Sequence, residues 1–394
     1  LKRMDFFRTL AELSTQLPGG ETLYTIFVFV VVLGILVFIH EWGHYAAAKS
    51  VGIKVEEFAI GFGKAIIRWT DKHGTDWKIA IIPLGGYVRM KGQEDGKPIE
   101  LEGAESDSFA AKSLLQRSWV VFAGPFANFV LALVVFAGVL SLFGEYKLSP
   151  QVGLVQENMP AMEVGLQEGD IIHAVNDTVI STWDELQKMT AASAEKPLHL
   201  IVKREESLLP IMLTPQTTTF TDLLGDTHTV GRIGIAPSGE NFLVKYGIFE
   251  GVLNGALKTW EITALTVTSV YKLIIGAVSP EHLAGPLGIA NMASESASHG
   301  TYHLLFFLAI ISINLGIVNL IPIPVLDGGH LVFFAIEAIK GSPVGEKTQA
   351  WSLRIGITLI LLLVLFSTGN DIQRMEVVQK WMKTEKEELV EVNK

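Results

Sequence analysis

The chain of 394 residues contains no cysteine. Disulfides, thiolate zinc sites and cysteine nucleophiles are therefore excluded, and any zinc must be bound by His, Asp or Glu. Charged residues are scarce at 18%, whereas soluble proteins of this size carry about 25%. No basic block occurs and the net charge is −10, which argues against a nucleic-acid partner. This composition predicts an integral membrane protein with room for one domain outside the membrane.

Long apolar runs, by contrast, are abundant. Four have about the length that the hydrocarbon core requires, and we predict that each is a transmembrane helix. They are residues 22–50, 119–143, 303–322 and 351–368. Residues 246–278 are also apolar but carry two Glu and two Lys, a pattern typical of an amphipathic helix lying in the membrane interface.

The first apolar run leads directly into His40-Glu41-Trp42-Gly43-His44, an HExxH motif. On a helix, His40 and His44 lie one turn apart on the same face, so both imidazoles can bind one metal ion. Glu41 beside them can act on the attacking water. The alternative is an interfacial anchor in which His44 extends to water. Ionisable residues at the edge of a membrane span favour the functional interpretation.

A catalytic zinc site needs a third protein ligand, and Asp327 is the best candidate. It follows Pro322 and Pro324, which must interrupt the third helix. Broken backbone at membrane depth is tolerated where it is buried or lines a wet cavity. Asp327 could instead serve as the N-cap of a helix over 329–340. His330 is the rival third ligand. A fifth span at 246–278 would place Asp327 on the opposite membrane face from His40, which supports the count of four.

Two asparagines, Asn128 and Asn319, are polar residues within otherwise apolar helices. Amides in such positions commonly form interhelical hydrogen bonds. They could instead bind a substrate strand or stabilise an oxyanion. The residues alone leave both interpretations open for each asparagine.

Two polar regions separate the spans. Residues 51–118 contain several β-rich runs divided by Gly-containing turns, which predict a small antiparallel sheet. Residues 49–118 hold eleven Lys and Arg, against nine in the longer stretch 144–300, so we expect the sheet to be cytoplasmic. Residues 151–216 predict short strands, a helix near 182–192 and a closing hairpin. Their Gly169-Asp170 region looks like the core of a PDZ domain, which by this topology is extracytoplasmic.

These motifs together resemble the site-2 protease family (M50-type intramembrane zinc metalloproteases), specifically its bacterial regulator of sigma-E protease branch in a single-PDZ form. The matching motifs are HEWGH, GFGK at 61–64, IPLGGYV at 82–88, AGPFAN at 123–128, GPLGIA at 285–290 and NLIPIPVLDGGH at 319–330. The resemblance covers roughly residues 22–370.

The resemblance implies that one Zn²⁺ is bound by His40, His44 and Asp327, with Glu41 as the general base. Asn319 and Pro322 would contact the substrate, and the sheet after the first span would be a membrane-reentrant element that pairs with unwound substrate. The implied substrates are single-span membrane proteins already trimmed by a site-1-type protease, for example an anti-sigma factor stub or remnant signal peptides. The implied location is the bacterial inner membrane.

The expected fold is a multi-span α-helical membrane protein with four transmembrane helices, a membrane-associated β-sheet element and one extracytoplasmic PDZ-like α+β domain. A transporter is one rival function, but it would need internal repeats, which are not found, and it gives no reason for Glu41 beside His40. An inactive PDZ-bearing scaffold is a second rival, and the complete set of Glu41, both histidines and Asp327 counts against it. The expected segments are an N-terminal extracytoplasmic piece (1–21), span one (22–50), the sheet region (51–118), span two (119–143), the PDZ-like domain (151–216), a linker with the interfacial helix (217–300), span three with the following helix (303–340), span four (351–368) and a polar tail (369–394).

Overall fold

The computed structural model describes residues 5–92, 105–222 and 225–374, so the predicted tail lies outside the described residues from residue 375 onward. The chain divides into two compact units. Unit 1 comprises Leu1–Val139, Gly251–Thr268 and Ser279–Lys394. Unit 2 comprises Leu140–Glu250 and Ser269–Val278.

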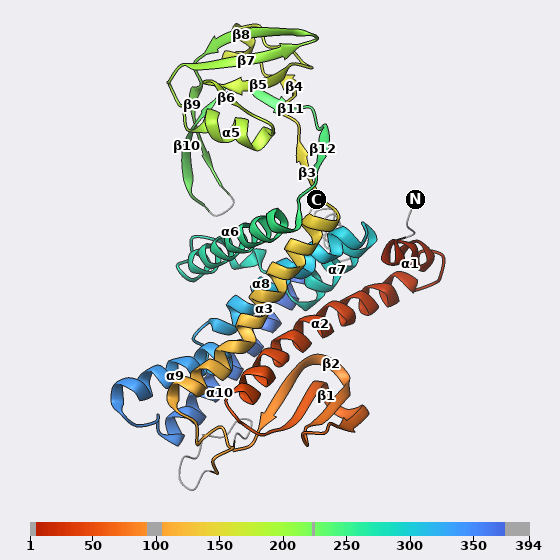
Figure 1. Ribbon diagram of the computed structural model, residues 1–394, viewed down its shortest axis with the longest axis vertical. Coiled ribbons are helices and arrows are strands. Elements are labelled where there is room, and N and C mark those ends of the chain that lie inside the picture. The colour runs from red at the N-terminus through yellow and green to blue at the C-terminus, as the bar shows by residue number, and fades with distance from the viewer. Residues whose placement is uncertain (1–4, 93–104, 223–224, 375–394) are drawn as a thin grey trace, which may run out of the picture. The chain divides into compact units, whose positions relative to one another are not determined.

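Unit 1 is built mainly from helices (Figure 1). These are α1 (Phe6–Ser14), α2 (Gly20–Ser50), α3 (Leu114–Leu142), α7 (Pro286–Ser298), α8 (Thr301–Leu320), α9 (Asp327–Lys340) and α10 (Glu346–Arg374), together with part of α6 (Ile248–Ile274) and a short 3-10 turn at Pro280–His282. Within the described ranges, α2, α3, α8 and α10 are long and apolar enough to cross a membrane. The prediction of four such helices is confirmed, and α6 is not among them.

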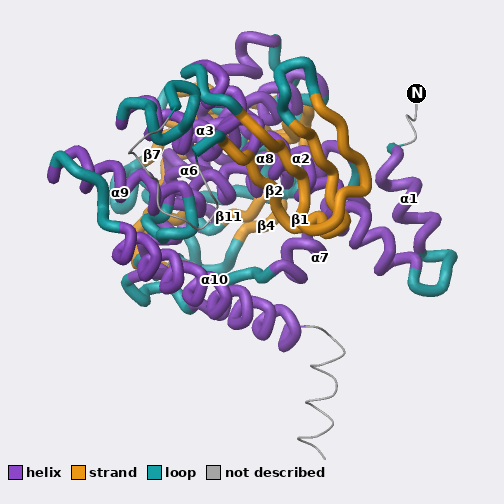
Figure 2. Tube along the Cα trace, turned by 90° about the horizontal axis from the view of Figure 1, so that it is seen from below, coloured by secondary structure: helices purple, strands orange, loops and turns teal. Residues whose placement is uncertain are grey.

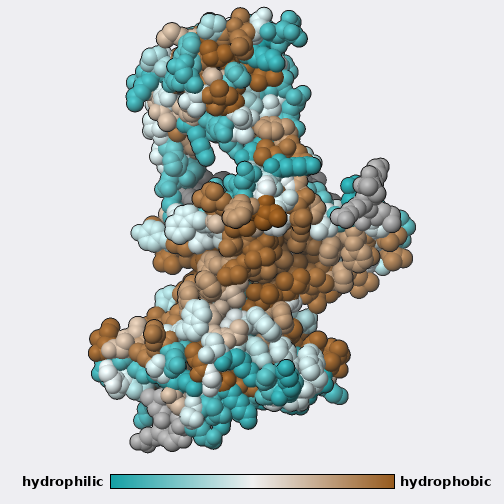
Figure 3. Space-filling view, viewed as in Figure 1, coloured by the Kyte–Doolittle hydropathy of each residue, from teal (hydrophilic) through white to brown (hydrophobic). Residues whose placement is uncertain are grey.

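The helices pack through small and branched side chains. Val28 and Leu36 of α2 lie in one buried cluster with Ala293 and Ala297 of α7. A second buried cluster joins α3 to α8 and includes Phe136. The outward faces of these helices are also apolar, and Figure 3 shows a continuous apolar surface over this part of unit 1. Such a surface is stable in lipid and would be a liability in water.

The sheet of unit 1 consists of two long, bent strands, β1 (Val55–Thr70) and β2 (Asp76–Met90), which lie beside α2 (Figures 1 and 2). Each bend divides a strand into two segments, so Phe58 pairs with both Val88 and Trp77. The segment order is 86–90, 55–60, 76–80 and 65–70. Segments 57–60 and 76–79 run in the same direction. The predicted sheet is therefore present, but it is not wholly antiparallel.

Unit 2 combines a four-stranded sheet with one longer helix. The sheet order is β6 (Thr178–Val179), β5 (Ile171–Val175), β7 (Leu198–Arg204) and β8 (Ser207–Leu213). Helix α5 (Trp183–Ala191) begins with a capping box between Thr182 and Glu185. Trp183, Leu186, Leu200 and Ile172 belong to its buried core. The predicted helix and the closing hairpin β7–β8 are both present.

Three predicted boundaries differ from the structure. Unit 2 is wider than 151–216, because β3 (Glu145–Leu148) pairs with β12 (Asn241–Val244) and β4 (Val152–Val155) pairs with β11 (Ile235–Pro237). Residues 217–300 are not mainly a linker, since they also form the hairpin of β9 (Gln216–Thr221) and β10 (Thr227–Arg232) and the packed helix α7. Residue 369, where the polar tail is predicted to begin, lies within α10, which ends at Arg374.

Candidate metal centre

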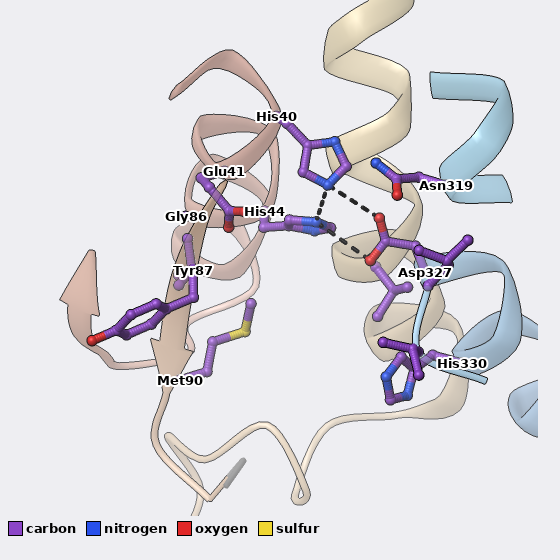
Figure 4. A pocket seen from close by; sticks show the side chains of 13 residues that line it. His40, Glu41, His44, Gly86, Tyr87, Met90, Asn319, Asp327 and His330 are labelled. Atoms are coloured by element: carbon purple, nitrogen blue, oxygen red, sulfur yellow. Dashed lines mark hydrogen bonds and ion pairs between the residues drawn. The ribbon is translucent and has the colours of Figure 1, made fainter. Parts of the chain in front are cut away.

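Three side chains from two distant segments meet inside unit 1 (Figure 4). His40 and His44 of α2 place their Nε2 atoms 3.2 Å apart. Asp327, the first residue of α9, places Oδ2 3.2 Å from Nε2 of His40 and Oδ1 3.5 Å from Nε2 of His44. The three side chains are only 11%, 11% and 17% exposed. They form one of two clusters in the described part of the chain that could hold a metal ion.

The donor set fits zinc. Ligand atoms about 2.0–2.1 Å from a tetrahedral zinc lie about 3.3–3.4 Å from one another. The separations of 3.2, 3.2 and 3.5 Å match this edge length. Two imidazoles and one carboxylate also leave one of four positions open, as in catalytic zinc sites. The geometry agrees with the predicted ligand set, whose roles are taken up below as a proposal.

Two glycines let α2 and α3 approach closely enough to form this centre. A Cβ on Gly43 would lie 2.8 Å from Cβ of Ala127. A Cβ on Gly124 would lie 2.8 Å from Cδ2 of His44 and closer still to Cε1 and Nε2. Nδ1 of His44 lies 2.9 Å from the carbonyl oxygen of Val120. Helix α3 therefore supports the imidazole of His44 with its backbone.

The segment between α8 and α9 brings Asp327 to the histidines. Helix α8 ends at Leu320, and Pro322 and Pro324 lie in the break before α9. The start of α9 has no side-chain cap hydrogen bond, and its N-cap position is Leu326 rather than Asp327. The alternative that Asp327 caps the helix is therefore wrong. His330 lines the same pocket but is not part of the three-residue cluster (Figure 4).

A pocket of about 270 Å³ opens beside the cluster. Glu41 is 9% exposed and lines it, as does Asn319 (Figure 4). The last segment of β2 contributes Gly86, Tyr87 and further residues to its wall. Gly86 and Tyr87 are not among the predicted site residues, although a Gly-Gly pair within a strand is a signal of close backbone approach.

The phenol of Tyr87 points away from the metal ligands (Figure 4) and is held by two hydrogen bonds. Its hydroxyl donates to Oε1 of Glu57 at 2.8 Å, and Nζ of Lys78 donates to the hydroxyl at 3.3 Å. Burial, followed by the hydrogen bond to Glu57, raises the pKa of Tyr87. The hydroxyl therefore stays protonated at neutral pH and keeps the ring in place.

Of the three residues predicted to bind substrate, only Asn319 lines the pocket. Pro322 is exposed in the break and lies outside the lining. Asn128 has 0% exposure and also lies outside the lining. Its Nδ2 is 3.1 Å from Nδ1 of His40. Asn128 therefore contacts this predicted ligand at the ring nitrogen that does not face Asp327. With this burial, Asn128 does not form part of the pocket wall.

Comparisons with known proteins place relatives of this chain among metalloproteases. The model of peptidase family M50 matches residues 28–363. A Rhizobium meliloti protein named "Putative zinc metalloprotease" is 38% identical over 360 residues, covering 89% of this chain and 96% of that protein. A Campylobacter jejuni protein with the same description is 38% identical over 370 residues, covering 93% of this chain and 99% of that protein.

A third relative is the regulator of sigma-E protease of Salmonella typhimurium. It is 33% identical over 448 residues, covering 90% of this chain and 99% of that protein. The alignment of 448 positions exceeds the 394 residues of this chain. That relative therefore carries insertions that this chain lacks.

Proposed function

This chain belongs to peptidase family M50, and on that premise we propose that it cleaves peptide bonds inside transmembrane segments of single-span membrane proteins already trimmed by another protease. That the chain is a zinc metalloprotease follows from its family. The observation that carries the proposal is the meeting of His40, His44 and Asp327 beside Glu41, in a unit with four helices of spanning length.

In this proposal His40, His44 and Asp327 hold the zinc ion. Bound zinc acts as a Lewis acid and lowers the pKa of water to about 7. Glu41 takes the proton of the attacking water and returns it to the departing amine. Asn319 lines the pocket with an amide that can donate a hydrogen bond to the carbonyl oxygen under attack.

The edge of β2 offers a place for an unwound substrate. A helical substrate shields its own peptide groups, so it must open before hydrolysis. Among the described residues, segment 86–90 is paired along one edge only, with 55–60. Three of its residues, Gly86, Tyr87 and Val88, line the pocket. A substrate strand added to the free edge would satisfy its backbone groups and pass the candidate zinc site.

Glu41→Gln separates the catalytic proposal from a purely structural metal site. The variant retains the three ligands, so we expect one zinc per chain but no cleavage of a pre-trimmed single-span reporter. Glu21→Gln is the matched control, because Glu21 is an exposed glutamate in the first turn of the same helix. Cleavage by Glu41→Gln at the wild-type rate would refute the role of Glu41.

The proposed location is the bacterial inner membrane, with the metal centre toward the cytoplasm and unit 2 outside. The absence of cysteine allows a direct test, since any introduced thiol is unique. Ser207 on β8 and Ser113 before α3 are both exposed. In intact spheroplasts, a membrane-impermeant maleimide should label Ser207→Cys and spare Ser113→Cys. The reverse pattern would contradict the orientation.

Unit 2, which contains the predicted PDZ-like domain, is proposed to exclude substrates with an intact outer domain. Leu148 of β3 faces Asn241 of β12, so residues 149–240 can be replaced by an Asn-Gly turn that closes β3 and β12 into a hairpin. The shortened protein should cleave untrimmed reporters that the full chain leaves intact. Unchanged selectivity would reject the filter role. The physiological substrate, for example an anti-sigma factor stub or remnant signal peptides, would emerge from membrane fragments that accumulate with Glu41→Gln.

A further inference from the structure

Of the two polar side-chain atoms of Asn128 on α3, Nδ2 has a hydrogen-bond partner and Oδ1 has none among the described residues. The residue is fully buried at 0% exposure. Its backbone oxygen accepts a hydrogen bond from Oγ of Ser312 at 2.8 Å. Its Nδ2 lies 3.1 Å from Nδ1 of His40, whereas Oδ1 has no hydrogen-bond partner within the described ranges. A buried amide oxygen without a donor costs about 1–3 kcal/mol, so this arrangement calls for an explanation.

The two histidines are supported in parallel ways by α3. Their Nε2 atoms converge on Asp327, while their Nδ1 atoms are directed away from it (Figure 4). Nδ1 of His44 is met by the carbonyl oxygen of Val120 at 2.9 Å. Nδ1 of His40 is met by the amide of Asn128. Each imidazole therefore has one partner behind it on α3.

Zinc binding through Nε2 requires that the group next to each Nδ1 accept a hydrogen bond. A neutral imidazole that gives its Nε2 lone pair to a metal carries its proton on Nδ1, and this N–H must donate. The carbonyl of Val120 can accept such a bond. The NH₂ group of Asn128 cannot. A half-turn of the amide about its Cβ–Cγ bond exchanges the two atoms and places Oδ1 against Nδ1 of His40. The same half-turn gives Oδ1 the partner that it lacks and moves the NH₂ group to the position that Oδ1 occupied.

We infer that, in the zinc-loaded enzyme, Oδ1 of Asn128 accepts the Nδ1–H of His40 and holds this imidazole in the tautomer that presents Nε2 to the metal. Asn128 is then a positioning residue that acts through His40 and does not touch substrate. This inference rests on the proposed ligand set. In this role, the asparagine of the AGPFAN segment supports the metal centre although it lies 88 residues from His40 in sequence.

Zinc affinity of the full-length protein in detergent tests the inference without an activity assay. Asn128→Leu keeps the branching at Cγ but removes the acceptor, and loss of such a partner typically weakens metal binding about 10–100-fold. Asn128→Asp keeps an acceptor oxygen, so its zinc dissociation constant should stay within about threefold of wild type. Competition with a chromophoric chelator measures both. The visible spectrum of the Co²⁺-substituted protein should change with Leu and not with Asp.

Asn314→Leu is the matched control. Asn314 is an amide in α8 that accepts an interhelical hydrogen bond from Thr266 at 3.0 Å and lies outside the lining of the pocket. Its loss should leave zinc affinity unchanged. Wild-type affinity in Asn128→Leu, or equal weakening in Asn128→Asp and Asn128→Leu, would overturn the inference. If Asn128→Leu does not fold, Asn128→Asp alone decides, since weakened binding there contradicts an accepting role.

His40→Ala distinguishes failure of this inference from failure of the ligand assignment. Loss of zinc in His40→Ala with wild-type affinity in Asn128→Leu would refute only the role of Asn128. Retention of zinc in His40→Ala would refute the ligand set itself.

Discussion

The replacement Gly124→Ala tests how closely α3 must approach the metal centre. The added Cβ would lie 2.8 Å from Cδ2 of His44 and closer to its other ring atoms. Carbon–carbon contacts are normally about 3.5–4.0 Å, so the ring and α3 must separate by about 1 Å. Zinc–ligand distances tolerate only about 0.2 Å of change. The methyl group and the bound position of His44 are therefore incompatible.

The expected change in zinc affinity depends on whether the strain affects the zinc-bound state, the zinc-free state or both. Overpacking costs about 1–3 kcal/mol, which is less than the typical free energy of unfolding of about 5–15 kcal/mol, so Gly124→Ala should fold. The imidazole of His44 can turn away once zinc leaves, so the cost falls on the zinc-bound state. Since 1.4 kcal/mol is tenfold in affinity, the zinc dissociation constant should rise about 5- to 150-fold. Chelator competition measures it.

Gly138→Ala is the matched control on the same helix. In the described part of the chain, a Cβ at Gly138 meets nothing within 4 Å, so zinc affinity should be unchanged, and helix propensity should raise stability by about 0.5–1 kcal/mol. The reasoning is refuted if Gly124→Ala binds zinc as tightly as Gly138→Ala. Equal weakening in both variants would also refute it, because a general effect on α3 would then be responsible.

Three further predictions concern the rest of the chain. Burial acts to raise the pKa of Asp170, but hydrogen bonds from Arg204 and from the backbone of Gln167, together with the charge of Arg204, lower the pKa overall. The ionised carboxylate therefore stabilises unit 2 above its unfolded pKa of about 3.9. Hydrogen exchange in β5 should accelerate, beyond the intrinsic rate, as pH falls below this value. Asp170→Asn should lack this acceleration. Arg117→Met leaves Glu337 without its ion pair at 2.6 Å, and thermal unfolding should show about 3–5 kcal/mol of destabilisation, largely recovered by adding Glu337→Leu. Thr182→Ala removes the acceptor of the α5 capping box and should cost unit 2 about 1 kcal/mol, measured by denaturant unfolding.

Local sequence patterns account for much of the metal centre. The i, i+4 spacing puts His40 and His44 on one face of α2 regardless of the tertiary fold. The prolines before Asp327 require a break, and a carboxylate at such a break is free to turn inward. Four apolar runs give four helices because hydrocarbon demands a defined length. In each case a constraint within one segment determines the outcome.

Contacts between distant segments could not be predicted in the same way. The burial of Asn128 against His40 depends on the approach of α2 to α3 through Gly43 and Gly124. An amide of unknown orientation fits both a substrate role and a supporting role. Strand β11 pairs with β4 across about eighty residues, and the polar run of β9 has no alternating apolar face. Such strands are recognisable only from their partners.

Zinc content of the purified protein tests the central claim most directly, when Asp327→Ala and His330→Ala are measured beside wild type. Both residues line the pocket, but only Asp327 reaches the two histidines. The account predicts one zinc per chain in wild type and in His330→Ala, and loss of zinc in Asp327→Ala. Zinc retained in Asp327→Ala and lost in His330→Ala would contradict it.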